Sequence, residues 1–272
     1  MPELPEVETV RRDLSRRYVG DRLEHLEVTG KRTVRRHAPG RLATLEGHVL
    51  RNIGRHGKYL LFEWDDGRVL VAHLRMSGQL LAATGEPAAH THAVFSFVKA
   101  GELHFVDPRT FGEFFLGDRA GEGPEVAQLA HLGPDALEVK TSYLAKAFAG
   151  RRAPVKSLLV DQRVLAGIGN IYADEILYEA KVRPDRPAGK LTREEVGRLA
   201  RSVRSVLGAA VKARGSTLRD KRYTDVSGAA GNYQLQHRAY GRAGQSCLRC
   251  GAPVERARIG AKSAYFCPNC QR

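Results

Sequence analysis

Four cysteines near the end of the chain are the residues best suited to hold a metal. They form two CxxC pairs separated by 16 residues, Cys247 with Cys250 and Cys267 with Cys270. Four thiolates at these spacings can close a tetrahedral zinc site between two hairpin turns. Strand-like segments at 254–259 and 264–266 lie between the pairs. We therefore predict one structural Zn2+ ion, which holds together a ribbon too short to bury a core of its own.

The opening Met1-Pro2-Glu3-Leu4-Pro5-Glu6 could carry covalent chemistry. Pro2 is small enough for Met1 to be removed, which would leave a free secondary amine. Such an amine can attack an electrophilic sugar carbon and form an iminium without losing a further proton. A free α-amino group titrates near pH ~8, so a usable fraction is neutral at physiological pH. From the residues alone, Pro2 is either a nucleophile or an ordinary chain end.

The charge of the chain indicates a polyanionic partner. Its 272 residues include 44 Lys and Arg against 30 Asp and Glu, which gives a formal net charge of +14. Residues 201–272 hold fourteen of the basic side chains and three of the acidic ones. Nucleic acid and an anionic membrane surface both fit such a region. The chain lacks a basic amphipathic helix with large apolar anchors, which disfavours the membrane.

Targeting signals are also absent from the sequence. No stretch reaches the ~20 apolar residues of a membrane span. The N-terminal residues include Glu3, Glu6, Glu8 and Asp13 and have no apolar signal-peptide core. We therefore expect a cytoplasmic protein, in which paired cysteines favour metal over disulfides.

The first half of the chain predicts one helix followed by antiparallel strands. Val7, Val10, Leu14 and Tyr18 recur at helical spacing, in a helix whose first position Pro5 can occupy. Short apolar runs between turn residues then indicate a sandwich or barrel, at 59–64, 69–74, 93–98, 103–106 and 114–116. A loop at 117–124 leads to a short helix and to the domain boundary near residue 133.

The second half predicts helices. Segments 154–164 and 170–180 are joined by the tight turn Gly167-Ile168-Gly169. Thr192 and Glu195 form a capping box that starts a long amphipathic helix through Val211. The fold class is therefore α+β with two domains, in which a helix plus an antiparallel β-sandwich or barrel precedes a helical domain with a β-hairpin zinc ribbon.

Several motifs occur in a fixed order along the chain. They are Pro2-Glu3-Leu4-Pro5-Glu6-Val7-Glu8, Gly57-Lys58-Tyr59, His73-Leu74-Arg75-Met76-Ser77-Gly78, Asp107-Pro108-Arg109-Thr110-Phe111-Gly112, Gly167-Ile168-Gly169-Asn170-Ile171-Tyr172-Ala173-Asp174-Glu175 and the closing cysteines. Together they resemble the bacterial formamidopyrimidine-DNA glycosylases, which remove 8-oxoguanine. The resemblance covers essentially the whole chain. It implies a catalytic β-sandwich domain at 2–132, a helix-two-turn-helix domain with a lesion loop at 133–231, and a zinc finger at 232–272.

The resemblance also implies a mechanism. After the damaged nucleotide is flipped out of the helix, Pro2 attacks C1′ and displaces the base. Glu3 acts as general acid and base, and β,δ-elimination then cuts the strand. Lys58 binds the phosphate that flanks the flipped nucleotide. Glu6 matches a second carboxylate near the lesion, where it is equally explained as a charge at a helix N-terminus, and Ser216 contacts the lesion through its backbone.

The remaining implied residues contact duplex DNA, and the enzyme is expected to act as a monomer. Met76, Arg109 and Phe111 fill the hole left by the extruded base, with Phe111 as wedge and Arg109 paired to the orphaned cytosine. From composition alone, Met76 and Phe111 would be core residues. The phosphate contacts are assigned to His73, Lys156, Asn170, Tyr240 and Lys262.

Two features depart from the family pattern. Lys262 stands in the zinc hairpin where the family usually has Arg, so it keeps the charge but loses the bidentate fork. The segment 216–223 resembles the loop that closes over 8-oxoguanine, but Lys221-Arg222 looks like extra length. We assign no individual side-chain roles within that loop.

Two other functions fit parts of the sequence. An enzyme of the endonuclease VIII type would use the same chemistry on oxidised pyrimidines. Leu4, the Met76, Arg109 and Phe111 trio and the long 216–232 loop favour the purine type. A catalytically silent DNA-binding protein with a zinc ribbon would not need Pro2 and Glu3, which are both present.

Overall fold

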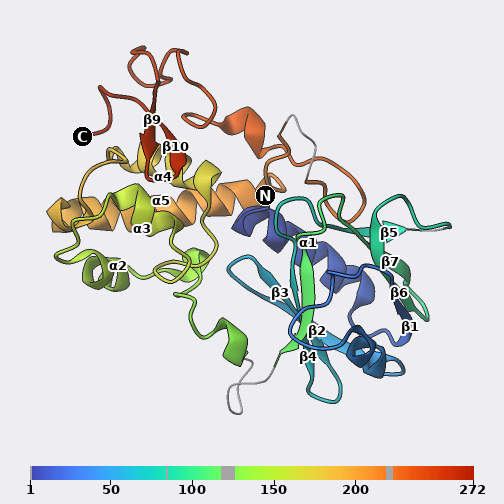
Figure 1. Cartoon of the computed structure of the whole chain (residues 1–272). Helices are drawn as coiled ribbons and strands as arrows, with labels where there is room; N and C mark the ends of the chain where they lie inside the picture. Colours follow the sequence, from blue (N-terminus) through green and yellow to red (C-terminus); the bar gives the residue numbers. More distant parts are fainter. Residues whose placement is uncertain (1, 84, 118–125, 219–222) are drawn as a thin grey trace. The chain divides into compact units, whose positions relative to one another are not determined.

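The computed structural model describes residues 2–83, 85–117, 126–218 and 223–272 (Figure 1). Contacts divide the chain into two compact units. The first unit is Met1–His131 with Ala213–Asn232, and the second is Leu132–Lys212 with Tyr233–Arg272. Segment 213–232 therefore packs with the β-rich unit, whereas the family resemblance places its residues up to 231 with the helices that they follow. The extra length predicted at Lys221-Arg222 and most of the predicted loop 117–124 lie outside the described residues.

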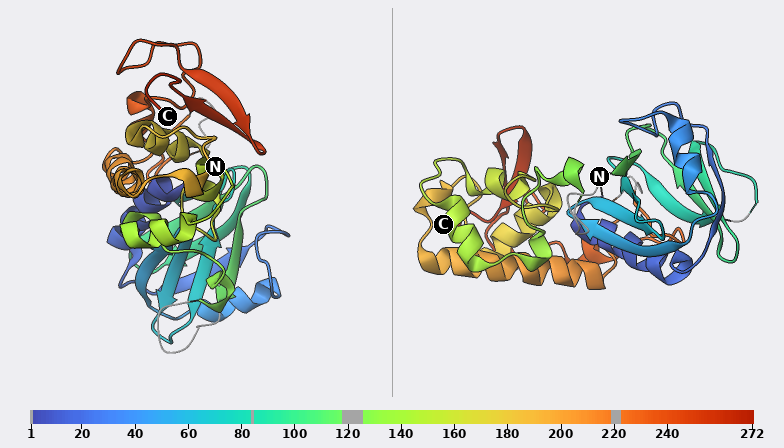
Figure 2. Two further views of the ribbon diagram at one scale, coloured as in Figure 1. Left: turned by 90° about the vertical axis from the view of Figure 1, so that its left-hand side faces the viewer. Right: turned by 90° about the horizontal axis from the view of Figure 1, so that it is seen from below.

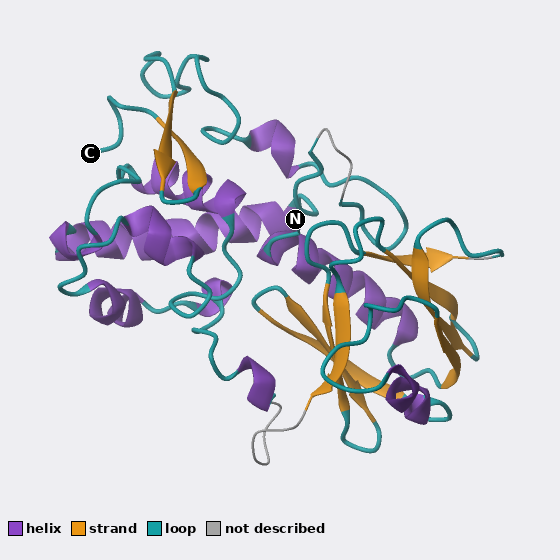
Figure 3. Cartoon of the chain, in the orientation of Figure 1, coloured by secondary structure: helices purple, strands orange, loops and turns teal. Residues whose placement is uncertain are grey.

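The first unit contains antiparallel strands, as predicted. They are β1 (Leu23–Val28), β2 (Leu50–His56), β3 (Tyr59–Trp64), β4 (Val69–His73), β5 (Gln79–Ala83), β6 (Thr91–Phe97), β7 (Gly101–Val106) and β8 (Glu113–Gly117). They form two four-stranded sheets, in the orders β1-β6-β7-β5 and β2-β3-β4-β8 (Figure 3). One apolar core contains side chains from both sheets. Within it, Trp64 of one sheet stacks on Phe97 of the other with ring centroids 6.5 Å apart.

The N-terminal helix α1 (Leu4–Tyr18) belongs to this unit and follows the predicted apolar stripe. Val7, Val10 and Leu14 are at most 1% exposed and belong to the same core as the sheets. The helix begins at Leu4, one residue before the predicted start, and Pro5 lies in its first turn, where its missing N–H costs nothing. Glu3 therefore occupies the N-cap, which fixes the opening motif to the start of a buried helix.

The second unit is helical and ends in a hairpin. Its helices are α2 (Thr141–Phe148), α3 (Val155–Val160), α4 (Asn170–Ala180) and α5 (Arg193–Lys212), and its strands β9 (Glu255–Ile259) and β10 (Lys262–Phe266) pair antiparallel. Figure 2 shows the long α5 in orange and the hairpin in red. Short 3-10 turns complete the two units: η1 (Pro39–Leu45), η2 (Ala127–Leu129), η3 (Ala136–Glu138), η4 (Ala188–Lys190) and η5 (Tyr233–Gln236).

Two local signals in the helical unit had different outcomes. The capping box is confirmed, because Glu195 N–H donates to Thr192 Oγ1 at 3.2 Å and Thr192 N–H donates to Glu195 Oε2 at 2.8 Å. The predicted helix 154–164 was too long, since α3 ends at Val160. The Asp161 carboxylate accepts the Arg163 N–H at 3.0 Å, so a side-chain turn replaces the next helical turn. Among the described residues, no helix is long and apolar enough to cross a membrane.

Candidate functional site

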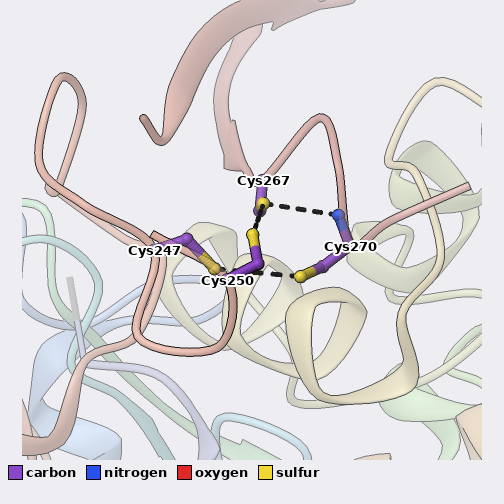
Figure 4. A group of neighbouring side chains, drawn as sticks. All are labelled: Cys247, Cys250, Cys267 and Cys270. Carbon is purple, nitrogen blue, oxygen red and sulfur yellow. Dashed lines mark hydrogen bonds between the residues drawn. The ribbon is translucent and has the colours of Figure 1, made fainter. Parts of the chain in front are cut away.

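The four cysteines come together at the base of the β9–β10 hairpin (Figure 4). Their sulfur atoms all lie within 4.8 Å of one another. Cys247 Sγ lies 3.9 Å from Cys270 Sγ, and Cys250 Sγ lies 3.5 Å from Cys267 Sγ. Zn–S bonds of about 2.3 Å in a tetrahedron give comparable sulfur separations. The cluster therefore fits one structural zinc ion, as predicted.

At the start of α1, a buried carboxylate joins two backbone segments that are far apart in sequence. Glu6 Oε2 accepts the Glu3 N–H at 2.8 Å, and Glu6 Oε1 accepts the Ser216 N–H at 2.7 Å. Glu3, Glu6 and Ser216 are at most 4% exposed. An added Cβ at Gly215 would lie 2.7 Å from Glu6 Oε1, so only glycine permits this approach. The opening motif and segment 213–218 thus meet at one buried carboxylate.

An ion-pair network around Glu8 holds the β2–β3 turn, which carries Lys58, against α1. Arg55 Nε donates to Glu8 Oε2 at 3.0 Å, and Arg55 Nη1 donates to the Gly57 carbonyl at 2.9 Å. Burial would raise the pKa of Glu8, but hydrogen bonds from Arg11, Arg12 and Arg55 outweigh it and hold that pKa at about 2. Lys58 follows Gly57 directly and is only 6% exposed.

His73 ends β4 as a buried, uncharged ring. Burial, together with the charges of Arg75 and Lys58, lowers its pKa to about 3. Its Nδ1 accepts the Arg75 N–H at 2.9 Å, so the ring proton lies on Nε2. An edge contact with Tyr59, at a centroid distance of 4.4 Å, fixes the ring further. His73 can therefore donate one neutral hydrogen bond.

The buried carboxylate of Asp107 organises the loop that carries Arg109 and Phe111. It accepts the N–H groups of Phe111 at 2.8 Å and Gly112 at 2.7 Å. It also accepts the Ser77 hydroxyl at 2.6 Å, and Ser77 directly follows Met76. The side chain of Asp107 thus joins the segment that carries Met76 to the loop that carries Arg109 and Phe111, which are predicted to fill the space left in the DNA by the extruded base.

The side chains of these segments lie nearer the surface than their backbone. Phe111 is 40% exposed, Arg109 is exposed and Met76 is half-buried. The Arg109 guanidinium lies over the Phe111 ring, 4.8 Å from its centroid. Phe111 is therefore not a core residue, which is what its apolar side chain alone would suggest. Its ring is available to a ligand.

In the second unit, the turn before α4 presents Asn170 at the first helical position. Gly167 has a positive φ of 109°, which glycine tolerates. Gln162 holds this turn with its amide, because Oε1 accepts the Gly167 N–H at 2.9 Å and Nε2 donates to the Ile168 carbonyl at 2.8 Å. The N–H groups of the first turn of α4 form a potential anion site beside Asn170.

The structure does not present Lys156 for the phosphate contact that the sequence suggests. Lys156 is 1% exposed, and its ammonium donates to Asp174 at 2.6 Å and to the Ser263 carbonyl at 2.5 Å. Asp174 also accepts the Tyr265 N–H at 3.1 Å. Burial raises the pKa of Asp174, while Lys156 opposes that shift. This pair ties α3 and α4 to β10, which is a structural role.

The next acidic residue, Glu175, holds the segment that carries Tyr240. Its carboxylate accepts the N–H groups of Arg238 at 2.9 Å, Ala239 at 2.9 Å and Tyr240 at 2.8 Å. The half-buried Tyr240 ring packs on Tyr265 of β10, with centroids 5.3 Å apart. Lys262, at the start of the same strand, is exposed. Tyr240 and Lys262 are thus positioned on the hairpin side of the second unit.

Comparisons with known sequences identify the family. The model of the formamidopyrimidine-DNA glycosylase N-terminal domain matches residues 1–114, and the model of the H2TH domain of these enzymes matches 132–222. A zinc finger found in FPG and IleRS matches residues 244–272. The chain belongs to the formamidopyrimidine-DNA glycosylase family. The family member of Pelotomaculum thermopropionicum is 40% identical over 278 residues, which cover 100% of this chain and 99% of that protein.

Solved structures from the family have the same fold. The MutM (Fpg) protein of Thermus thermophilus matches with a TM-score of 0.87 and 42% identity, over 99% of this chain and 98% of that chain. The Fpg of Lactococcus lactis, in a complex with DNA that contains an abasic site, matches with a TM-score of 0.87 and 32% identity. That match covers 99% of each chain.

Several positioning residues escaped the sequence interpretation. Asp107 and Glu175 lie inside family motifs, but nothing in their spacing indicates which N–H groups they accept. Arg55 and Gln162 act through backbone carbonyls and N–H groups of tight turns. A polar residue next to a glycine-containing turn is a weak signal that could have suggested both.

Proposed function

We infer that the chain is a DNA repair enzyme that removes oxidised purines, such as 8-oxoguanine and formamidopyrimidines, from duplex DNA and cuts the strand. It is thus both a glycosylase and an AP lyase. Family members have been solved with DNA that contains Fapy-dG or carbocyclic 8-oxo-G. The observation that carries the proposal is the Glu6 carboxylate, which joins the Pro2-Glu3 motif to Ser216. It acts in the bacterial cytoplasm, on nucleoid DNA, as a monomer.

The proposed nucleophile is the nitrogen of Pro2 after removal of Met1. Its lone pair forms a bond to C1′ of the flipped nucleotide while the bond from C1′ to the base breaks. The base leaves with that electron pair and takes up a proton, and the attacking nitrogen loses its own proton. Glu3 protonates the ring oxygen O4′, so the sugar opens and an iminium joins Pro2 to C1′. The iminium acidifies the C2′ proton. Loss of that proton expels the 3′ phosphate, and a second elimination expels the 5′ phosphate.

Lys58 and His73 are proposed to hold phosphates near the flipped nucleotide. Lys58 supplies a charge on a turn held by Arg55, and His73 supplies a neutral N–H. Glu6 and Ser216 are proposed to lie beside the base. The Ser216 N–H is bonded to Glu6, so a lesion acceptor would either replace that carboxylate or bind next to it.

Each of the two units is proposed to contact duplex DNA through exposed or half-buried side chains. Phe111 enters the base stack, Arg109 pairs with the orphaned cytosine and Met76 fills the remaining space. Asn170, Tyr240 and Lys262 contact backbone phosphates. A zinc ion bound by four thiolates would have no open position for a substrate or water. It would therefore hold the hairpin that carries Lys262 and take no part in the reaction.

Borohydride trapping on duplex DNA with 8-oxoguanine opposite cytosine tests the nucleophile. We expect a covalent adduct on the N-terminal peptide, which begins with Pro2. Pro2→Gly should abolish excision, whereas Pro5→Ala, a change in the same motif, should not. An adduct on a lysine, or an active preparation that retains Met1, would overturn the assignment.

Glu3→Gln tests the general acid separately. This variant should bind lesion DNA as the native protein does but excise at least about a hundredfold more slowly. Unchanged turnover would show that Glu3 takes no part in proton transfer.

Excision from thymine-glycol duplexes by the native protein separates the two enzyme types, because preference for thymine glycol would favour the endonuclease VIII alternative.

A further inference from the structure

The end of α5 leads into an unusual backbone turn. Arg214 and Gly215 both have positive φ, of 62° and 76°. Glycine adopts this conformation freely, but other residues rarely do unless their surroundings hold them. The turn directly precedes Ser216, whose N–H donates to Glu6. The conformation at Arg214 therefore decides where Ser216 is presented.

The Arg214 guanidinium binds two carboxylates from different segments. Its Nη2 donates to Asp225 Oδ2 at 2.6 Å and also to Asp13 Oδ2, and its Nε donates to Asp225 Oδ2 at 3.1 Å. Asp13 lies on α1, the helix that begins directly after Glu3. Asp225 lies in stretch 223–232, and Arg214 itself lies in stretch 213–218. The side chains of Asp13 and Asp225 are 16% and 4% exposed. One side chain thus ties both stretches to α1.

Neutral hydrogen bonds join the same two stretches beside Arg214. The Tyr223 hydroxyl donates to the Arg214 carbonyl at 3.0 Å, and the Thr217 hydroxyl donates to the Tyr223 carbonyl at 2.8 Å. Tyr223 is 5% exposed and belongs to the core of the first unit, together with Val226. These contacts therefore fix stretches 213–218 and 223–232 to each other and to the first unit. Arg214 provides the ion pairs among them.

We propose that Arg214 is a positioning residue that makes segment 213–218 competent to hold a damaged base, through its ion pairs with Asp13 and Asp225. The inference rests on the proposed function, in which Ser216 lies beside the lesion. Base excision requires this segment. Strand cleavage at an existing abasic site does not, because no base is present and Pro2, Glu3 and Lys58 lie on other segments. Arg214 therefore affects the choice of substrate and leaves the lyase chemistry intact.

The test compares two reactions for each variant under single-turnover conditions. One is excision of 8-oxoguanine opposite cytosine, and the other is cleavage at a preformed abasic site. R214Q keeps a flexible polar side chain but removes both ion pairs. R214K restores the charge but can satisfy both carboxylates less well, since it lacks the guanidinium fork. K212Q removes the same charge from an exposed position two residues earlier and serves as the matched control.

We expect R214Q to slow excision by about tenfold, because charge-assisted hydrogen bonds of this kind are worth roughly that factor or more. Abasic-site cleavage should stay within about twofold, R214K should recover part of the loss, and K212Q should change neither rate. Unchanged excision by R214Q would overturn the inference. An equal loss in both reactions would also overturn it, because that result indicates a direct phosphate contact.

D13N provides a second route if R214Q folds poorly in a thermal melt. It removes the negative charge on α1 and weakens the contact to Arg214 while Asp225 remains, so the ratio of excision to abasic-site cleavage should fall in the same direction. An unchanged ratio would contradict the proposal. The wild-type enzyme is assayed first. Failure of the wild type to cleave abasic sites would overturn the proposed function itself, which distinguishes that failure from a failure of the Arg214 inference.

Discussion

At the scale of single residues, buried carboxylates position the candidate site. Glu6, Asp107 and Glu175 are each at most 2% exposed, and each accepts two or more backbone N–H groups. Charged acceptors form stronger hydrogen bonds than neutral ones. The sequence motifs locate these acids but not their partners, because the bond from Ser216 to Glu6 joins residues 210 positions apart. Their roles were therefore visible only in the folded chain.

Asp107→Asn should disrupt the loop that carries Arg109 and Phe111. The amide nitrogen of Asn would face N–H donors, which leaves buried groups unpaired. We expect a loss of about 2–3 kcal/mol in the free energy of unfolding and slower excision opposite cytosine. Urea unfolding and single-turnover assays measure the two effects. Ser77→Ala removes one partner only and should cost about 1 kcal/mol. Equal effects of the two substitutions would contradict this role for Asp107.

His73 should remain neutral throughout the working pH range. Its lowered pKa, about 3, means that the folded protein takes up no proton there while pH falls from 8 to 5. The unfolded chain does take up that proton near pH ~6.5, so the buried ring makes stability decrease as pH falls below that value. Nitrogen-15 NMR should show Nε2 protonated and Nδ1 unprotonated at every pH in this range. A titration of the His73 ring near pH 6.5 would refute the assignment.

At the scale of elements, periodic segments were predicted well and sparse ones were not. The helices α1 and α5 have continuous apolar stripes, and strands β3, β4 and β6 have long apolar runs. Strands β1, β2 and β5 were missed because few of their side chains are fully buried; β1, for example, buries only Leu23 and Leu26. Segment 213–232 has no periodicity, and specific contacts such as those of Tyr223 decide where it packs.

Glu8→Gln should loosen the attachment of the β2–β3 turn to α1. The Glu8 pKa lies below its ordinary value of 4.5, so its contribution to stability is complete above that pH and is lost as pH falls through about 2. We expect the variant to lose about 2 kcal/mol of unfolding free energy at neutral pH, after a discount for the partly exposed arginines. The difference from wild type should narrow between pH 5 and 2. Glu24→Gln, at an exposed position of β1, is the control and should change little at any pH.

At the scale of the whole molecule, net charge predicts the class of partner but not which lysine and arginine side chains contact that partner. The formal charge of +14 includes buried lysines such as Lys156, whose ammonium is already bonded to Asp174. Burying such a pair costs desolvation, so its value lies in fixing α3 and α4 to the hairpin. Family motifs alone cannot separate a lysine of this kind from an exposed one such as Lys262.

The salt dependence of duplex binding distinguishes these two lysines. Each phosphate that a cation neutralises adds about 0.9 to the slope of log affinity against log salt concentration. Lys262→Ala should therefore reduce the magnitude of that slope by about one. Lys156→Met combined with Asp174→Asn removes the buried pair without leaving a lone charge, and it should lower thermal stability while the slope stays unchanged. Fluorescence anisotropy over a salt series, with a thermal melt of each variant, gives both quantities. A reduced slope for the Lys156 variant would return that residue to the phosphate interface and would contradict the structural role inferred from its burial.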